Sequence, residues 1–312
     1  MEIRNMGGSG LRVSLIGLGC NNFGERVELD DARPVVHKAL DLGITFFDTA
    51  DRYGSDGRSE IVLGELLGVR RKDIVLATKF GFDLNKRGVI AGGSRRYVMK
   101  AVEDSLRRLR TDWIDLYQMH TPDPDTPIEE TLGVLDDLVH AGKIRYFGLS
   151  NFAGWQVAEA EWTARIAGLN RCVSVQDEYS LIYRGHEKEL IPAVEAYGLG
   201  FLPYRPLASG LLTGKYKRNE APPPGTRFAN LQRHADKYAS DRNFDVAERV
   251  EAFARDGGWA PADLALAWLA SKPFVASVIP GASRPEQVEA NVNALSRRLT
   301  GGELAELDRI SA

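Results

Sequence analysis

Cysteine is scarce in this chain, and the scarcity narrows the class of protein. Only two cysteines, Cys20 and Cys172, occur among 312 residues, and both fall in or beside predicted strands. Two thiols cannot form the disulfide framework of a small secreted domain, so we expect free thiols in a reducing compartment. Residues 1–4 show no apolar signal-peptide core. These absences together predict a cytoplasmic protein.

A strong charge of either sign is also missing. The 40 lysine and arginine side chains nearly balance the 43 aspartate and glutamate side chains, which gives a formal net charge of -3. Binding to nucleic acid needs a clustered basic surface, and only short basic clusters such as residues 70–72 occur. No apolar run reaches the roughly 18–20 residues that a membrane-spanning helix needs. We therefore expect neither nucleic acid nor a membrane as a partner.

What the chain does contain is an alternation of short β-rich runs and helical segments. Residues 94–109 illustrate the helical spacing, with apolar side chains at Val98, Val102, Leu106 and Leu109. The predicted strands cover residues 15–17, 46–48, 74–79, 113–120, 144–149, 172–176, 200–204 and 275–279. The predicted helices cover residues 30–41, 59–67, 94–109, 128–141, 152–167, 187–197, 244–255, 262–270 and 285–295. Between residues 205 and 243 the pattern predicts a long irregular stretch, broken by proline and glycine at residues 222–225.

Eight strands, each followed by a helix or a long loop, predict an α/β protein folded as a (β/α)8 TIM barrel, with one domain over residues 1–312. Residues 2–13, with Gly7, Gly8 and Gly10 in the middle, predict an N-terminal β-hairpin placed to plug the bottom of the barrel. A doubly wound open sheet is the structural alternative. It would normally carry a glycine-rich dinucleotide-binding motif, of which residues 17–22 hold only the first two glycines.

Four chemically active side chains gather at the ends of predicted strands. Asp48, Lys79 and His120 each end a strand, and Tyr53 lies on the loop that follows Asp48. In a barrel of parallel strands, catalytic groups collect at the C-terminal strand ends. Tyr53 can then protonate a carbonyl oxygen as general acid, with Lys79 expected to lower the tyrosine pKa. We expect Asp48 to pair with Lys79 and His120 to orient the substrate, although each side chain alone is also typical of a structural role.

The segment of residues 47–54, FDTADRYG, resembles the Asp-to-Tyr signature of the aldo-keto reductase family. Lys79 and His120 also stand where that family has them, and the likeness covers nearly the whole chain. Residues 208–216, ASGLLTGKY, are similar to the branch that includes potassium-channel β-subunits and many bacterial reductases. The resemblance implies reduction of an aldehyde or ketone by hydride from a nicotinamide cofactor.

The resemblance further implies that the cofactor is NADPH and that separate stations along the chain bind it. Ser150, Asn151 and Gln176 offer hydroxyl and amide groups to the nicotinamide carboxamide, while Tyr204 offers a ring for stacking. Arg284 precedes a predicted helix, whose N-terminus together with a guanidinium favours the 2′-phosphate. The other cofactor positions that the resemblance implies are Gly19, Cys20, Asn21, Arg205, Pro206, Leu207, Gly210, Lys215, Gly281, Ser283, Gln287 and Asn291, the last two of them beside the adenine.

Two departures from the family pattern concern the ligand pocket. Arg205 stands where many members carry serine, so it either contacts the pyrophosphate or points elsewhere. Asn21 replaces a tryptophan found in many members, which implies a different pocket roof. Phe23, Phe80 and Phe82 are candidate pocket walls or core residues.

The sequence therefore predicts an enzyme, an NADPH-dependent reductase of small-molecule carbonyl compounds, with no metal and no evident obligatory protein partner. A second possibility is a cofactor-bound regulatory or redox-sensing subunit with slow turnover. A third, Lys79 as a Schiff-base lysine, is weakened because an aspartate partner would keep the amine charged.

Overall fold

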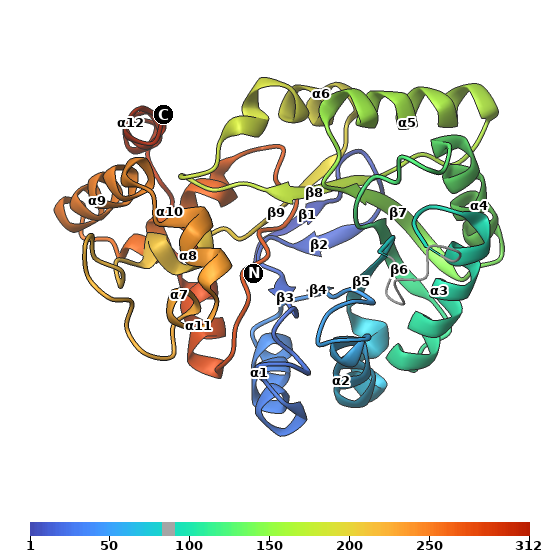
Figure 1. The fold of residues 1–312 in the computed structure, drawn as a ribbon, viewed down its shortest axis with the longest axis horizontal. Coiled ribbons are helices and arrows are strands. Elements are labelled where there is room, and N and C mark those ends of the chain that lie inside the picture. The colour runs from blue at the N-terminus through green and yellow to red at the C-terminus, as the bar shows by residue number, and fades with distance from the viewer. Residues whose placement is uncertain (83–90) are drawn as a thin grey trace.

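The computed structural model describes residues 1–82 and 91–312, in which a ring of strands lies inside an outer ring of helices (Figure 1). One sheet runs in chain order through the parallel strands β3 (Leu18–Gly19), β4 (Phe46–Asp48), β5 (Val75–Phe80), β6 (Ile114–Met119), β7 (Ile144–Ser150), β8 (Ser174–Glu178) and β9 (Gly200–Tyr204). A doubly wound sheet would reverse its strand order. The sequential order excludes that alternative.

The barrel closes through the segment that the sequence predicts as its eighth strand. Val275 and Ile279 form parallel bridges to β9, and Val278 forms one to Ile16 on the other side. Backbone hydrogen bonds of 2.9 Å from Gly17 N to Val278 O and 2.8 Å from Val278 N to Leu15 O hold this seam. The (β/α)8 barrel is thus confirmed. The first strand lies slightly later than residues 15–17, and the eighth pairs through separate bridges.

The helices around the barrel follow the predicted positions closely. They are α1 (Leu29–Asp41), α2 (Arg58–Leu67), α3 (Arg95–Leu109), α4 (Ile128–His140), α5 (Gly154–Ala167), α6 (Leu190–Tyr197), α9 (Asp241–Asp256), α10 (Pro261–Ser271) and α11 (Pro285–Asn293). In α3 the apolar positions noted above are buried against the barrel. None of the helices within the described ranges is long and apolar enough to cross a membrane.

Several helical segments lie wholly or partly outside the predicted helices, among them the 3₁₀ segments η1 (Gly68–Asp73) and η2 (Gly185–Lys188). The stretch after β9 contains the 3₁₀ segment η3 (Ala208–Thr213), α7 (Arg227–Asn230) and α8 (Gln232–Tyr238), so the prediction of an irregular region is wrong there. The chain ends in α12 (Gly301–Ile310), whose Thr300 hydroxyl and Glu303 carboxylate cap each other's backbone N–H groups. The Thr-x-x-Glu spacing at residues 300–303 is typical of a helix N-terminus and could have predicted α12.

The N-terminal hairpin, β1 (Ile3–Asn5) paired antiparallel with β2 (Arg12–Ser14), seals the barrel as predicted. Its Met6, Leu11 and Val13 are buried in the same apolar cluster as Phe46 and Leu116 from the barrel strands. Because a Cβ at Gly7 would stand 2.3 Å from Gly198 O, the turn needs glycine to lie this close to the barrel. The Arg4 guanidinium donates to the carbonyls of Ala270 (2.7 Å), Lys272 (3.2 Å) and Val275 (2.9 Å).

Candidate active site

The centre of the candidate site is a buried ion pair between neighbouring strands. Lys79 on β5 donates to Asp48 Oδ2 of β4 at 2.6 Å and to the Thr49 carbonyl at 2.8 Å. The other oxygen of Asp48 accepts from Gln176 Nε2 at 2.9 Å and Gln118 Nε2 at 3.2 Å. Both oxygens of the carboxylate are therefore satisfied, which a buried charge requires. The predicted Asp48–Lys79 pairing is present.

Tyr53 and His120 complete the group that the sequence predicts. The Lys79 ammonium lies 5.0 Å from the centre of the Tyr53 ring. The Tyr53 and His120 rings meet edge to face, with centroids 5.6 Å apart. All four side chains are thus gathered at the carboxyl ends of β4, β5 and β6, the end of a barrel where chemistry is usually found.

The protonation states of this group follow from burial first and charge second. Burial raises the pKa of Tyr53 and outweighs the opposing effect of the Lys79 ammonium, so the expectation of a lowered tyrosine pKa is wrong. Burial opposes the charge on Lys79, but Asp48 and Tyr53 outweigh it and the lysine pKa is raised. Burial and then the charges of Lys79 and Arg52 lower the pKa of His120 well below its ordinary value. The site therefore holds a neutral phenol, an ammonium and a neutral imidazole.

The positive charge on Lys79 argues against a role as a Schiff-base lysine. Such a lysine must lose its proton to act as a nucleophile. Here the amine is fully buried, paired with Asp48 and has a raised pKa. The arrangement is suited to holding a positive charge beside Tyr53.

Ser150, Asn151 and Gln176 lie together at the ends of β7 and β8, as predicted. Asn151 Nδ2 donates to His120 O (2.8 Å) and Ser150 Oγ (3.1 Å), while its Oδ1 accepts from Tyr204 OH at 2.7 Å. Gln176 Nε2 is used by Asp48 and by Gln118 Oε1. Within the described residues this leaves the Ser150 hydroxyl proton, one lone pair of Asn151 Oδ1, and Gln176 Oε1. A primary carboxamide needs one donor and two acceptors, so the remaining groups fit it.

At the start of α11, where the sequence predicts a phosphate site, the side chains are bonded to one another. Ser283 N and Oγ both contact Gln287 Oε1, at 2.8 Å and 3.1 Å. Arg284 is the exposed N-cap of α11, and Asn291 lies half-buried later on the same helix. The Gln287 side chain thus occupies donors that an anion would use at this helix N-terminus.

The remaining predicted positions differ in what they can offer a ligand. Gly19 and Gly281 bridge each other across the barrel seam, and Asn21 is exposed beside Gly281. Cys20 is fully buried, with its N–H on Asp48 O and its carbonyl accepting from the Ser59 hydroxyl, so its thiol does not face the strand-end surface. Beyond β9, Pro206 and Gly210 are buried, Leu207 is half-buried, and Lys215 is exposed.

Arg205 points toward Glu178 and Tyr238. Its Nη1 lies 3.2 Å from Tyr238 OH and 3.6 Å from Glu178 Oε2, and Tyr238 also bonds Glu178. Of the two orientations open to Arg205, the structure shows the one directed at α8 and β8.

Arg227 is a residue that sequence reasoning missed. This half-buried guanidinium donates to Asn22 Oδ1 at 3.2 Å, which brings α7 over the loop that follows β3. Burial and then the charges of Arg26 and Arg205 lower its pKa. Only the folded chain brings these arginines together, since residues 26, 205 and 227 are far apart in sequence. The resulting excess of positive charge is suited to an anion.

Phe82 is the wall residue that reaches the candidate site. Its ring lies edge to face with His120 at 4.9 Å, and the Arg52 guanidinium stacks over it at 3.9 Å. Phe23 and Phe80 are both fully buried in the apolar core. They support the barrel instead of lining a pocket.

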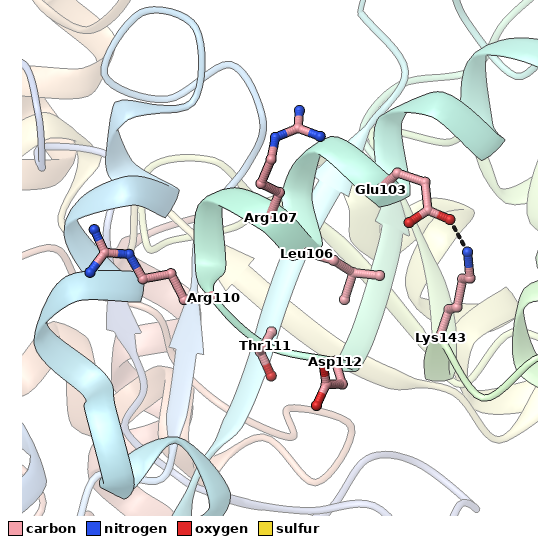
Figure 2. A pocket seen from close by; sticks show the side chains of 7 residues that line it. All are labelled: Glu103, Leu106, Arg107, Arg110, Thr111, Asp112 and Lys143. Atoms are coloured by element: carbon pink, nitrogen blue, oxygen red, sulfur yellow. Dashed lines mark hydrogen bonds and ion pairs between the residues drawn. The ribbon is translucent and has the colours of Figure 1, made fainter.

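A separate surface hollow lies at the opposite end of the barrel. It encloses about 510 Å³ and is lined by Glu103, Leu106, Arg107, Arg110, Thr111, Asp112 and Lys143. Figure 2 shows Glu103 and Lys143 paired across it. Asp112 precedes β6 and Lys143 precedes β7, so the hollow lies at amino-terminal strand ends, away from Tyr53. Residues at the amino-terminal end of a TIM barrel usually contribute to stability and not to catalysis.

Across residues 1–82 and 91–312, no group of three or more His, Cys, Asp or Glu side chains is placed to hold a metal ion.

Comparisons with known proteins agree with the geometry. The model of the Aldo/keto reductase family matches residues 15–312. A probable voltage-gated potassium channel subunit beta from Oryza sativa subsp. japonica is 36% identical over 305 residues, covering 95% of this chain and 91% of that protein. An L-glyceraldehyde 3-phosphate reductase from Escherichia coli (strain K12) is 35% identical over 327 residues, covering 99% of this chain and 92% of that protein.

Proposed function

Because the chain belongs to the aldo/keto reductase family, we propose that it reduces an aldehyde or ketone to the alcohol with NADPH and that Tyr53 supplies the proton. The observation that carries this proposal is the convergence of Tyr53, His120 and the buried Lys79–Asp48 pair at one end of the barrel. A carbonyl oxygen placed between the phenol and the imidazole would meet two hydrogen-bonding groups.

The proton step follows from the protonation states. Burial keeps Tyr53 neutral, so its proton is available when the carbonyl oxygen gains negative charge. The Lys79 ammonium then stabilises the phenolate that remains, and Asp48 keeps the ammonium in place. His120 is neutral, so one ring nitrogen carries a hydrogen that can bond the substrate oxygen without taking part in the proton transfer.

The cofactor would be held first by its carboxamide. A bound nicotinamide supplies the hydride in this chemistry. Ser150, Asn151 and Gln176 retain one donor and two acceptors, the complement of a carboxamide, and Tyr204 presents its ring beside them. Fixing the carboxamide selects the face of the ring that meets the substrate.

NADPH preference is the finer part of the proposal. Arg284 at the N-cap of α11 would meet a 2′-phosphate once Gln287 releases Ser283. Arg227, held by Asn22, adds positive charge near the loop after β3, where the pyrophosphate would extend. Charge-assisted bonds of this kind favour a phosphate over a hydroxyl.

The substrate we propose carries an anionic group beside its carbonyl. Arg52 stacks over Phe82, and Phe82 touches His120, so a guanidinium lies next to the reacting position. No described carboxylate pairs with Arg52. The named activity of the Escherichia coli relative, on a phosphorylated aldehyde, supports the same substrate class.

A second candidate function is a cofactor-bound subunit that turns over slowly and acts through a partner protein. The relatives named as probable potassium channel subunits favour it. So does an exposed apolar stripe on α5, formed by Trp155, Trp162 and Ile166 at helical spacing.

Oxidation of NADPH, followed by absorbance with a panel of neutral and anionic carbonyl compounds, tests the proposal. We expect multiple turnovers with at least one anionic aldehyde, and their loss in Tyr53→Phe. Oxidation that stops after one equivalent of bound NADPH, with every compound, would favour the subunit instead.

A further inference from the structure

A second buried polar cluster lies directly behind the Tyr53 loop. Asp51 is 1% exposed and Glu60 is 0% exposed. Glu60 Oε2 accepts from Arg108 Nε at 2.6 Å, and its Oε1 accepts from Thr78 Oγ1 at 2.5 Å. Asp51 has a single side-chain partner among the described residues, the hydroxyl of Tyr97. The proposed reduction uses none of these groups.

The hydroxyl of Tyr97 has two acceptors and one proton. It lies 3.0 Å from Asp51 Oδ2 and 2.9 Å from the Phe82 carbonyl oxygen. If Asp51 is ionised, the two acceptors compete for that proton and one buried acceptor loses its bond. If Asp51 is protonated, it donates to the Tyr97 oxygen while Tyr97 donates to Phe82. Only the protonated form satisfies both contacts.

The balance of charge leads to the same protonation state. Arg108 is the only cation that hydrogen-bonds this cluster among the described residues, and it is committed to Glu60. Burial and then the charge of Glu60 raise the pKa of Asp51 to about 7, against the smaller effects of Tyr97, Arg108 and Arg52.

The neighbouring phenols do not supply a compensating charge. Tyr117 faces the cluster with a buried hydroxyl that lacks a partner in the described chain, and its pKa is raised by burial and then by Asp51. Burial likewise raises the pKa of Tyr97. Both phenols therefore stay neutral, and the proton in question is the one on Asp51.

The group at the end of this hydrogen-bond chain touches the candidate site. Phe82 follows β5, the strand of Lys79, and its ring lies against His120 at 4.9 Å with Arg52 stacked over it. The Tyr97 bond fixes the Phe82 backbone from α3, so it also fixes this wall. Asp51 links the two sides of this arrangement. Its side chain contacts Tyr97, and its backbone N–H donates to the Lys79 carbonyl at 3.1 Å.

We propose that Asp51 carries a proton in the working protein, and that Asp51 and Tyr97 are positioning residues that hold Phe82 against His120 until that proton is lost. The consequence for turnover rests on the proposed function; the proton on Asp51 does not.

The proton is tested without any turnover. The full-length protein with ¹³C-labelled aspartate is titrated from pH 5 to pH 9 by infrared difference spectroscopy, with Asp51→Asn as the reference. We expect a protonated-carboxyl band in the wild type that disappears at a pH near 7 and is missing from Asp51→Asn. A band for ionised Asp51 throughout the range would overturn the proposal.

The positioning role is tested by the pH profile of kcat/KM with an aldehyde substrate. Loss of one buried hydrogen bond to the wall should lower the wild-type value by about three- to tenfold above pH 7. Asp51→Asn should lack this alkaline decrease, because its amide donates to Tyr97 at every pH. Tyr97→Phe should be low and flat, while Tyr146→Phe, remote from the cluster, keeps the wild-type profile.

Two results separate the possible failures. The same alkaline decrease in Asp51→Asn as in the wild type would rule out the positioning role. If no variant and no wild-type sample turns over any carbonyl, the proposed function fails, and the infrared titration still decides whether Asp51 holds the proton.

Discussion

At the carboxyl end of the barrel, the Lys79 and Asp48 side chains pair at 0% and 5% exposure, whereas at the amino end Lys143 and Glu103 pair at 32% and 50%. The first pair is surrounded by amide groups from Gln118 and Gln176 that satisfy its remaining lone pairs. The second lines the open hollow of Figure 2. Burying a charged pair costs desolvation free energy, and removing one partner then destabilises the fold strongly. A solvated pair costs little to form, and its loss changes stability little. The contrast in burial supports the proposal that the chemistry takes place at the carboxyl end.

Tyr53→Phe should give the largest effect at the carboxyl end. Loss of a general acid typically lowers turnover by roughly 10²–10⁴-fold, and the phenyl ring that replaces this half-buried side chain should keep the fold. Steady-state turnover with an accepted aldehyde measures it. Tyr146→Phe, near the amino end of β7, is the matched control. Near-normal turnover of the Tyr53 variant, with the chemical step shown to be rate-limiting, would remove Tyr53 from the proton transfer.

The two lysines make the sharpest test of the comparison. Lys79→Met leaves Asp48 buried without its partner, so the free energy of unfolding should fall by about 3–5 kcal/mol. Lys143→Met removes a partly exposed pair and should change it by about 1 kcal/mol or less. Chemical denaturation of both variants gives the two values. Equal losses would mean that the two ends do not differ in the way described.

Asp51 should make stability depend on pH. Its pKa is raised from 3.8 to about 7, so between these values the folded state holds a proton that the unfolded chain has lost. The free energy of unfolding should therefore fall as pH rises through that window, by up to about 4 kcal/mol at about 1.4 kcal/mol per pH unit. Denaturation of Asp51→Asn should show a flatter profile, with the exposed Asp112→Asn as control. Parallel profiles for the wild type and Asp51→Asn would contradict the buried proton.

Arg284→Ala should give the smallest effect. A charge-assisted hydrogen bond contributes roughly 1.5–3 kcal/mol, or about 10–150-fold in affinity. NADPH binding should weaken by about that factor and NADH binding should not, because NADH lacks the 2′-phosphate. Quenching of tryptophan fluorescence measures both, and Arg110→Ala at the amino end is the control. Equal losses for the two cofactors would exclude Arg284 from the phosphate site.

The sequence predicted the barrel and the gathering of Asp48, Tyr53, Lys79 and His120 because both depend on local pattern. Strand ends are visible as apolar runs that stop at Asp48, Lys79 and His120, and parallel strands end on one face whatever the details of packing. The helices at α7, α8 and α12 were missed, the first two because short helices of mixed polarity carry weak periodicity.

Local sequence pattern cannot predict how deeply a side chain is buried or which residue from a distant part of the chain contacts it. The direction of the Tyr53 pKa was wrong because desolvation, which outweighs Lys79, is a property of the packed site. Arg227 over Asn22 and Tyr97 beside Asp51 join residues that are far apart in the chain. Such contacts exist only once the barrel has closed.

That closure has a consequence for synthesis. Arg4 at the very start of the chain donates its guanidinium hydrogens to carbonyls at residues 270–275, and the first barrel strand region pairs with residue 278. A ribosome must therefore release the chain through residue 278 before the hairpin at residues 3–14 can take its place. Until the barrel has closed, the apolar side chains of Met6 and Val13 remain exposed to solvent. The nascent protein must then avoid aggregation through these side chains.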